Sequence, residues 1–204
     1  MKKQLKIFGF IYLAFLLITT ISCGGDDCGP FPDKYNITSF NWNVSDVEFA
    51  EDFYSNNNIT NNEVNYSNYG IVVKAKTEEY YSKIFNLNLT AKAYACSPVP
   101  PTTDDKITNI EVIINQNYSS TFLSGSNMAE KFKAGFINEQ ETFESMSLVD
   151  YINTNPKVSR EFILLLNDAP LENGEYTFTV KITMEGKTLD YFEFTTNSIT
   201  ITNN

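Results

Sequence analysis

Residues 176–186 read YTFTVKITMEG, a run in which large apolar side chains alternate with threonine and lysine. Successive side chains of a strand point to opposite faces of a sheet, so this period of two predicts a strand with one buried face and one wet face. Gly186 suits a tight turn, and a second strand-like run follows at residues 189–194. We therefore expect the two runs to pair as an antiparallel hairpin.

The same alternation recurs at residues 85–93, with Phe85, Leu87 and Leu89 on one face. With five shorter runs, the total is eight predicted strands. Helix signals are weak and fall inside one long crossover, residues 115–160, where Ser147 and Asp150 have capping-box-like spacing. Short strands without a β-α-β rhythm indicate an all-β protein, a single antiparallel sandwich with short helices in its crossover. The shorter strands are expected at 37–44, 71–75, 107–114, 162–166 and 198–201, and the helices at 127–133 and 147–153.

The first 22 residues predict a cleaved signal peptide, because three lysines precede a twelve-residue apolar run at 7–18. Such a run spans about 18 Å as a helix, whereas a bilayer core is about 30 Å thick. Thr20-Ile21-Ser22-Cys23 resembles a bacterial lipobox, although an aliphatic residue usually stands where this chain has Thr20. The resemblance implies cleavage before Cys23 and acyl chains, such as palmitate, attached there. A plain secretory signal with an unmodified cysteine is the alternative.

Residues 23–34 are expected to form a flexible tether, and residues 35–204 a single domain. The Gly24-Gly25-Asp26-Asp27 segment resembles the acidic export signal that follows the lipidated cysteine of Bacteroidota surface lipoproteins. That resemblance implies a lipid-anchored protein of the outer membrane, displayed on its outer face. A Gly-Asp linker without address information is the alternative.

Net charge limits the classes of partner that this protein can bind, and the cysteines predict a disulfide. The leader holds three of the 15 basic residues and none of the 25 acidic ones, so the remainder has a formal charge of −13. Such a body repels phosphate, which makes nucleic acid a poor partner and leaves membrane attachment to the acyl chains on Cys23. The remaining pair, Cys28 and Cys96, predicts a disulfide in an exported chain, with two free thiols as the alternative.

Few residues are suited to catalysis. The chain has no histidine and a single arginine, Arg160, which removes the histidine-dependent nucleophilic systems and histidine metal sites. No phosphate-binding glycine loop or paired-cysteine metal motif is present. Asp104-Asp105 and Glu78-Glu79 stand in expected turns and are interpreted as acids that face water. We therefore predict no catalytic residue, no metal and no cofactor.

Aromatic side chains offer the candidate binding residues. Trp42 alternates with asparagine in the strand expected at residues 37–44. We expect it to pack between two sheets, with an exposed sugar-stacking platform as the alternative. Tyr80 and Tyr81 are candidate ligand-stacking residues of the same kind, as are Tyr66 and Tyr69 near asparagine-rich turns.

Two groups of segments resemble uncharacterised Bacteroidota lipoproteins with immunoglobulin-like domains. The resemblance implies an immunoglobulin-like β-sandwich and brings no assigned activity or site residue. We therefore expect a cell-surface binding or accessory module for a glycan or protein partner. A structural envelope lipoprotein without a dissociable ligand is the alternative, and a carboxylate-based hydrolase is the least favoured. The segments are 162–166, 170, 173–180, 186 and 199–201 at the end of the chain, and 93–98 and 105–110 in its middle.

Overall fold

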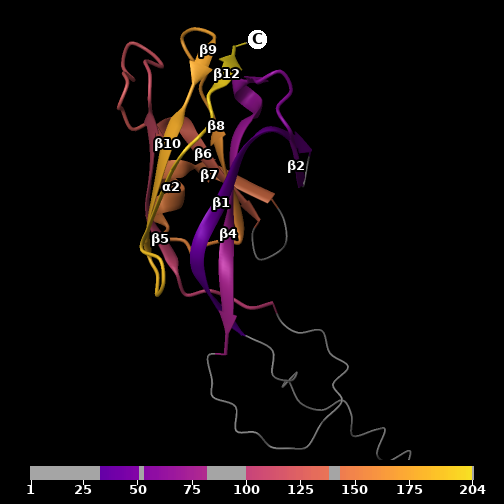
Figure 1. Ribbon diagram of the computed structural model, residues 1–204, viewed down its shortest axis with the longest axis vertical. Helices are drawn as coiled ribbons and strands as arrows, with labels where there is room; N and C mark the ends of the chain where they lie inside the picture. Colours follow the sequence, from indigo (N-terminus) through magenta and orange to yellow (C-terminus); the bar gives the residue numbers. More distant parts are fainter. Residues whose placement is uncertain (1–32, 51–52, 82–99, 138–142, 204) are drawn as a thin grey trace, which may run out of the picture.

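The computed structural model describes residues 33–50, 53–81, 100–137 and 143–203, and these are mostly β-structure (Figure 1). The largest sheet has six strands in the order β2-β1-β4-β8-β6-β7, and every neighbouring pair is antiparallel. Its strands are β1 (Lys34–Ala50), β2 (Phe53–Asn57), β4 (Tyr69–Tyr80), β6 (Phe132–Ile137), β7 (Phe143–Ser147) and β8 (Glu161–Leu166).

Two three-stranded sheets complete the described fold. The first has the antiparallel order β11-β10-β5. The second has the order β3-β12-β9, in which β12 is antiparallel to β9 and parallel to β3. Their strands are β5 (Lys106–Ile114), β10 (Phe178–Glu185) and β11 (Tyr191–Thr195), and β3 (Glu63–Asn65), β9 (Gly174–Tyr176) and β12 (Ile199–Thr202). The helical turns are η1 (Tyr66–Asn68), η2 (Ala129–Lys131) and α2 (Leu148–Asn153).

The expected hairpin is confirmed, since β10 and β11 pair antiparallel with Val180 opposite Phe194. The run that begins at Tyr176 is divided between two sheets, however. Tyr176 ends β9, which pairs with β12, whereas Phe178 begins β10. The backbone N–H of Phe178 donates to Thr196 Oγ1 at 3.0 Å, so a side chain replaces the strand partner at the point where the chain changes sheets.

The 115–160 crossover is only partly as expected. The helix at 147–153 is confirmed as α2, and the Ser147 hydroxyl accepts a hydrogen bond from the Asp150 N–H at 3.1 Å. The helix predicted at 127–133 is wrong, because only η2 forms there and β6 follows at once. Strands β6 and β7 extend the six-stranded sheet, so the described fold has twelve strands rather than eight. The strand expected at 85–93 lies outside the described residues.

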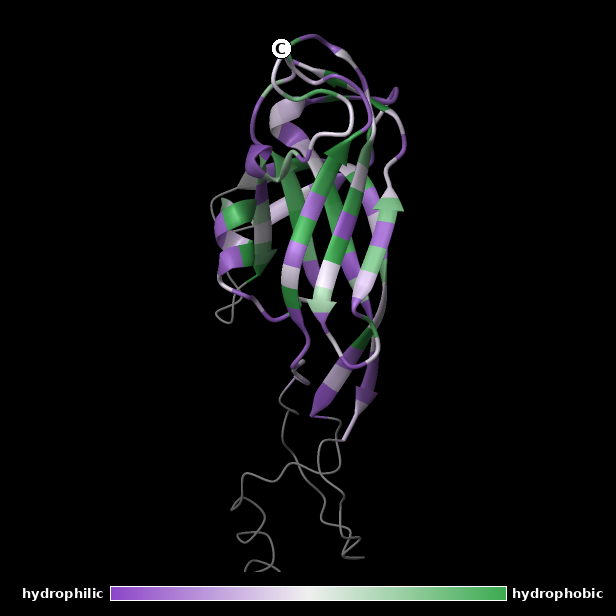
Figure 2. Ribbon diagram, turned by 90° about the vertical axis from the view of Figure 1, so that its left-hand side faces the viewer, coloured by the Kyte–Doolittle hydropathy of each residue, from purple (hydrophilic) through white to green (hydrophobic). Residues whose placement is uncertain are grey.

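The main core lies between one face of the six-stranded sheet and the two smaller sheets. Hydrophobic and hydrophilic residues alternate along many of the strands (Figure 2), and buried residues recur at every second position of β10. Phe178 is fully buried, and its ring lies 5.5 Å from that of Tyr69 and 5.4 Å from that of Phe132. Phe178, which belongs to the β11-β10-β5 sheet, therefore contacts both β4 and β6 of the six-stranded sheet.

The other face of the six-stranded sheet is directed away from the main core, and we call it the outer face. Val47, Val72, Ile163 and Leu165 form a second apolar cluster on it. Tyr54 of β2 and Phe143 of β7 pack against this cluster with ring centroids 5.1 Å apart. Because β2 and β7 are the two edge strands, this contact shows that the sheet curls into a half-barrel that is concave on the outer face.

Glycines permit this curl at two positions. A Cβ at Gly135 would lie 2.4 Å from the Phe143 ring, and one at Gly70 would lie 2.4 Å from Val47 Cγ2. Neither spacing is compatible with a side chain at the present positions of these neighbours. The missing side chains thus let Phe143 and Val47 lie directly on the backbone of the outer face.

The acids expected to face water differ in their roles. Asp104 is exposed and pairs with Lys34 at 2.7 Å. Asp105 is buried, and its carboxylate accepts backbone hydrogen bonds from Ile37 of β1 and from Lys187, between β10 and β11. The interpretation of Asp105 was therefore wrong, because a carboxylate that receives N–H donors from two segments can be buried. The turn expected at residues 78–79 was also wrong, since they belong to β4.

Buried tyrosines predict alkaline lability. Tyr151 is 3% exposed, and burial raises the pKa of its hydroxyl from 10.0 to about 12. Below pH 10 both the folded and the unfolded chain keep this proton, so the ionisation of Tyr151 does not change the unfolding free energy there. Between about pH 10 and 12 only the unfolded chain loses it, and the unfolding free energy should fall by about 1.4 kcal/mol per pH unit for this group.

Urea unfolding measured at successive pH values checks this expectation. The Tyr151→Phe variant has no proton to lose at this position, so its stability should fall less steeply above pH 10 than that of the wild type. Tyr69 and Tyr118, whose pKa values burial also raises, remain in both proteins. Equal slopes for the two proteins would contradict the assignment to Tyr151.

Candidate functional site

A pocket of about 300 Å³ opens at one end of the outer face. It lies where β6, β7 and the end of β8 meet the turn η1. We call it the Lys133 pocket. Its lining residues are Tyr66, Ser67, Lys133, Ser145, Leu165, Leu166 and Asn167.

Strand register brings the pocket residues together. Lys133 of β6 lies opposite Leu165 of β8 on one side and Ser147 of β7 on the other. Side chains alternate along β6, so Phe132 and Ala134 enter the main core while Lys133 projects from the outer face. Ser145 belongs to the same face, two residues from Ser147 along β7 and opposite Gly135.

The turn η1 supplies the opposite wall. Asn65 caps it, since its side-chain oxygen accepts hydrogen bonds from the Ser67 N–H at 2.9 Å and from the Ser67 hydroxyl at 2.7 Å. This cap satisfies a backbone donor that the short turn leaves free and holds Ser67 in place. Tyr66 stands beside it, half-buried and packed against the main core.

The lining of the pocket contains one basic residue and no acidic one, although the protein as a whole is acidic. In the part of the chain that the structure describes, no carboxylate forms an ion pair with Lys133, and no partner binds the hydroxyls of Tyr66 and Ser145. Asp168, which follows the lining residue Asn167, pairs with Lys131 at 2.6 Å. The pocket thus offers an ammonium group and uncommitted hydroxyls to a ligand, and no acid lines it.

Trp42 lies elsewhere, on the core side of β1. Its indole stacks on the Phe194 ring, with centroids 4.8 Å apart and an interplanar angle of 13°. Trp42 is half-buried and packs against the main core. One face of the indole is therefore occupied by Phe194 of β11, and a role in stacking a sugar stays a prediction.

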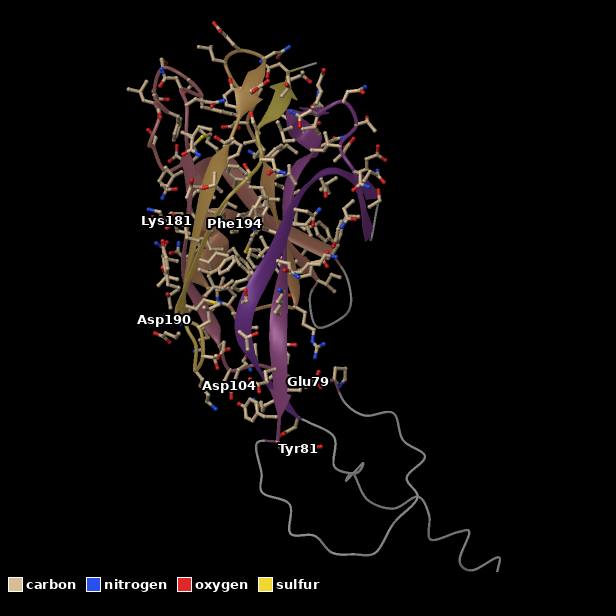
Figure 3. All side chains as sticks on the ribbon, viewed as in Figure 1. Glu79, Tyr81, Asp104, Lys181, Asp190 and Phe194 are labelled. Carbon is tan, nitrogen blue, oxygen red and sulfur yellow. The ribbon has the colours of Figure 1, made fainter. Side chains whose placement is uncertain are left out.

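Tyr80 and Tyr81 lie at the lower end of the molecule, where Figure 3 shows Tyr81 close to Glu79 and Asp104 and far from Phe194. Tyr81 is 48% exposed. Lys187 donates to the Tyr80 hydroxyl at 3.1 Å and stands 4.9 Å from the centre of its ring.

The predicted aromatics therefore do not form one site. Trp42 pairs with Val73 of β4, and Tyr80 follows seven residues later on that strand. At about 3.3 Å per residue, the two positions are about 23 Å apart along the strand. Cys23, Cys28 and Cys96 lie outside the described residues, so the lipid anchor and the disulfide stay predictions.

Sequence reasoning missed the Lys133 pocket because residues 127–133 were assigned to a helix. The alternation of Phe132, Lys133 and Ala134 is the signal that would have placed Lys133 on the exposed face of a strand. No comparable signal joins Tyr66 or Asn167 to it. Those residues meet Lys133 only because η1 packs against β8.

Other site types are not found in the described ranges. They contain no group of three cysteine, aspartate or glutamate side chains placed to hold a metal ion. None of their helices has the length and apolar character needed to cross a membrane. Arg160 pairs with Glu79 at 3.0 Å and stands 4.8 Å from the centre of the Tyr35 ring, so it is already engaged at the start of β8.

Comparison with known proteins gives a family without a function. No curated protein matches the chain, and no solved structure matches it. One family model matches residues 53–193, which is more than half of the 204 residues and includes every lining residue of the Lys133 pocket. The chain therefore belongs to the family described as a domain of unknown function (DUF5034).

Proposed function

We propose that this protein is a lipid-anchored binding module of the bacterial cell surface, and that it holds a glycan in the Lys133 pocket. The observation that carries the proposal is the lining of the pocket, where an uncompensated ammonium group and free hydroxyls surround a small hollow. Sugars are recognised by such donors beside an aromatic ring, and Tyr66 supplies the ring.

The remaining parts of the proposal come from the sequence. They are the lipid on Cys23, the display on the outer membrane, the Bacteroidota source and the immunoglobulin-like arrangement. The absence of histidine favours binding over catalysis, because the usual general bases and nucleophile partners are missing. An anchored binding module also needs no activity of its own, since it retains its ligand at the membrane for other proteins.

The anchor is tested in cells that express the full chain or its Cys23→Ala variant. Labelled palmitate should enter the wild type and not the variant. External protease should degrade the wild type on intact cells. A wild-type chain that takes up no label, or that is protected until the cells are broken, would contradict the anchored, outward-facing arrangement.

The binding site is tested by filling the pocket. Ser145→Trp places an indole among the lining residues, whereas Ser120→Trp places one on an exposed loop as the matched control. On a glycan array, the full wild-type chain and Ser120→Trp should bind the same glycans, and Ser145→Trp should lose them. Circular dichroism establishes that the variants fold. A wild type that binds no glycan, or a Ser145→Trp chain that binds unchanged, would overturn the proposal.

A further inference from the structure

We infer that the Lys133 pocket selects a hexuronate, a sugar residue that carries one carboxylate. This inference rests on the proposed function and specifies the ligand class of the same site. It follows from four properties of the pocket: its charge, the number of its cationic groups, its uncommitted polar groups and its size.

Charge is the first restriction. The chain has a formal net charge of −10, yet Lys133 stands among neutral residues. Its cross-strand neighbours are Leu165 and Ser147, whereas Lys181 on β10 lies between Glu111 and Glu193. An ammonium group in such surroundings attracts a carboxylate, because no acid of the pocket competes for it.

The number of cationic groups is the second restriction. The pocket holds one lysine and no arginine, and Arg160 is engaged with Glu79 at the start of β8. A phosphate group carries up to two charges and is held by guanidinium groups, or by a lysine together with several backbone N–H groups. A single ammonium matches a single carboxylate better.

Uncommitted polar groups provide the third restriction. The Ser145 and Tyr66 hydroxyls have no partner in the described part of the chain, and the Asn167 amide makes only one long contact, 3.5 Å to Asp168. A sugar ring presents hydroxyls that donate to and accept from such groups. The Leu165 side chain and the Tyr66 ring provide the apolar contact for the C–H face of the ring.

Size is the last restriction. About 300 Å³ is the lower limit of the usual range for small-molecule pockets, about 300–1,000 Å³. The pocket therefore accommodates one sugar residue, such as the terminal or branch residue of a polysaccharide, rather than an extended chain.

Titration of the full chain in detergent micelles tests the inference. Galacturonate and glucuronate are compared with galactose and glucose, and glucose 6-phosphate supplies the phosphate alternative. Binding is followed by changes in the NMR spectrum of the protein. We expect the hexuronates to bind about tenfold more tightly than the neutral hexoses, since a charge-assisted hydrogen bond is about twice as strong as a neutral one. Glucose 6-phosphate should bind more weakly than glucuronate.

Variants identify the residue responsible. Lys133→Gln should abolish the preference for hexuronates while weak hexose binding persists, and Lys133→Arg should retain the preference. Lys76→Gln is the matched control, an exposed lysine on β4 of the same sheet, and should bind like the wild type. An unchanged preference in Lys133→Gln, equal binding of hexose and hexuronate, or tighter binding of glucose 6-phosphate would overturn the inference.

These outcomes are distinguishable from failure of the proposed function. If the wild type binds array glycans that Ser145→Trp loses, but shows no preference for hexuronates, the binding module stands and the ligand class is wrong. If the wild type binds no glycan at all, both fail together.

Discussion

Replacing Asp105 by alanine is expected to lower the free energy of unfolding by about 4 kcal/mol. Asp105 is 3% exposed, and its two carboxylate oxygens accept hydrogen bonds from the Ile37 N–H at 2.8 Å and the Lys187 N–H at 3.3 Å. Alanine removes both acceptors. The Ile37 N–H is buried, and a buried donor left without a partner costs about 1–3 kcal/mol, and more when the partner was charged; the partly buried Lys187 N–H adds a smaller cost.

The position of Asp105 explains why its loss should have a large effect. The register of β1 against β4 shifts between Ile37 and Ser39, so the ladder is irregular where Asp105 binds. Lys187 lies in the connection between β10 and β11, which belong to the other sheet. One carboxylate thus connects the six-stranded sheet to the hairpin, and its removal weakens both attachments.

Thermal and urea unfolding check this prediction. In a chain of this size about 4 kcal/mol corresponds to a fall in Tm of about 8–16 °C. Asp104→Ala is the matched control, because the Asp104 carboxylate is exposed and makes only a surface ion pair with Lys34. Asp105→Asn keeps one acceptor oxygen and should be intermediate. If Asp105→Ala unfolded at the same temperature as Asp104→Ala, the bridging role of Asp105 would be wrong.

The second large effect is expected at Phe178, where alanine should cost about 3–5 kcal/mol, the usual cost of truncating a buried phenylalanine. The ring is 0% exposed and contacts Tyr69 of β4 and Phe132 of β6. Its removal leaves a cavity between the two sheets, and the rings of Tyr69 and Phe132 lose their contacts with Phe178.

Urea unfolding measures this effect as a lower midpoint with an unchanged slope. Tyr191→Ala is the control, since that ring is 46% exposed on β11 and surface substitutions change stability by about 0.5 kcal/mol or less. Phe178→Leu leaves a smaller cavity and should retain more stability, which provides a measurement if Phe178→Ala does not fold. A Phe178→Leu protein as stable as the wild type would contradict the central position of this ring.

Local pattern was sufficient for several elements. The alternation from Phe178 to Met184 predicted β10, and the glycine after it predicted the hairpin with β11. The spacing of Ser147 and Asp150 predicted the start of α2. Each signal lies within a few residues of the element that it specifies, because backbone periodicity and capping depend on neighbours in the chain.

Long-range pairing could not be predicted in the same way. Residues 132–137 and 143–147 were placed in the crossover, although they form β6 and β7. Gly135 interrupts the apolar pattern of β6 because the Phe143 ring occupies the place of its side chain. A glycine that weakens the local strand signal is thus required by a tertiary contact.

The Lys133 pocket depends on tertiary structure throughout. Tyr66 and Lys133 come from distant parts of the sequence. Lys133 meets Leu165 because β6 pairs with β8, and Tyr66 meets it because η1 packs against β8. The burial of Asp105 has the same origin, since its hydrogen-bond donors are 68 and 82 residues away along the chain. Neither arrangement leaves a periodic signal.

By itself, then, the sequence determined that this protein is rich in strands, which segments form β10, β11 and α2, and that it carries a strongly acidic charge. These properties depend on composition and on interactions between near neighbours. Only the tertiary structure decided that β6 and β7 extend the large sheet and that this sheet curls. It also decided that Asp105 is buried and that Lys133 lines a pocket. Burial and pocket formation depend on which distant segments pack together, and the residues next to a segment in the chain do not specify the segment that packs against it.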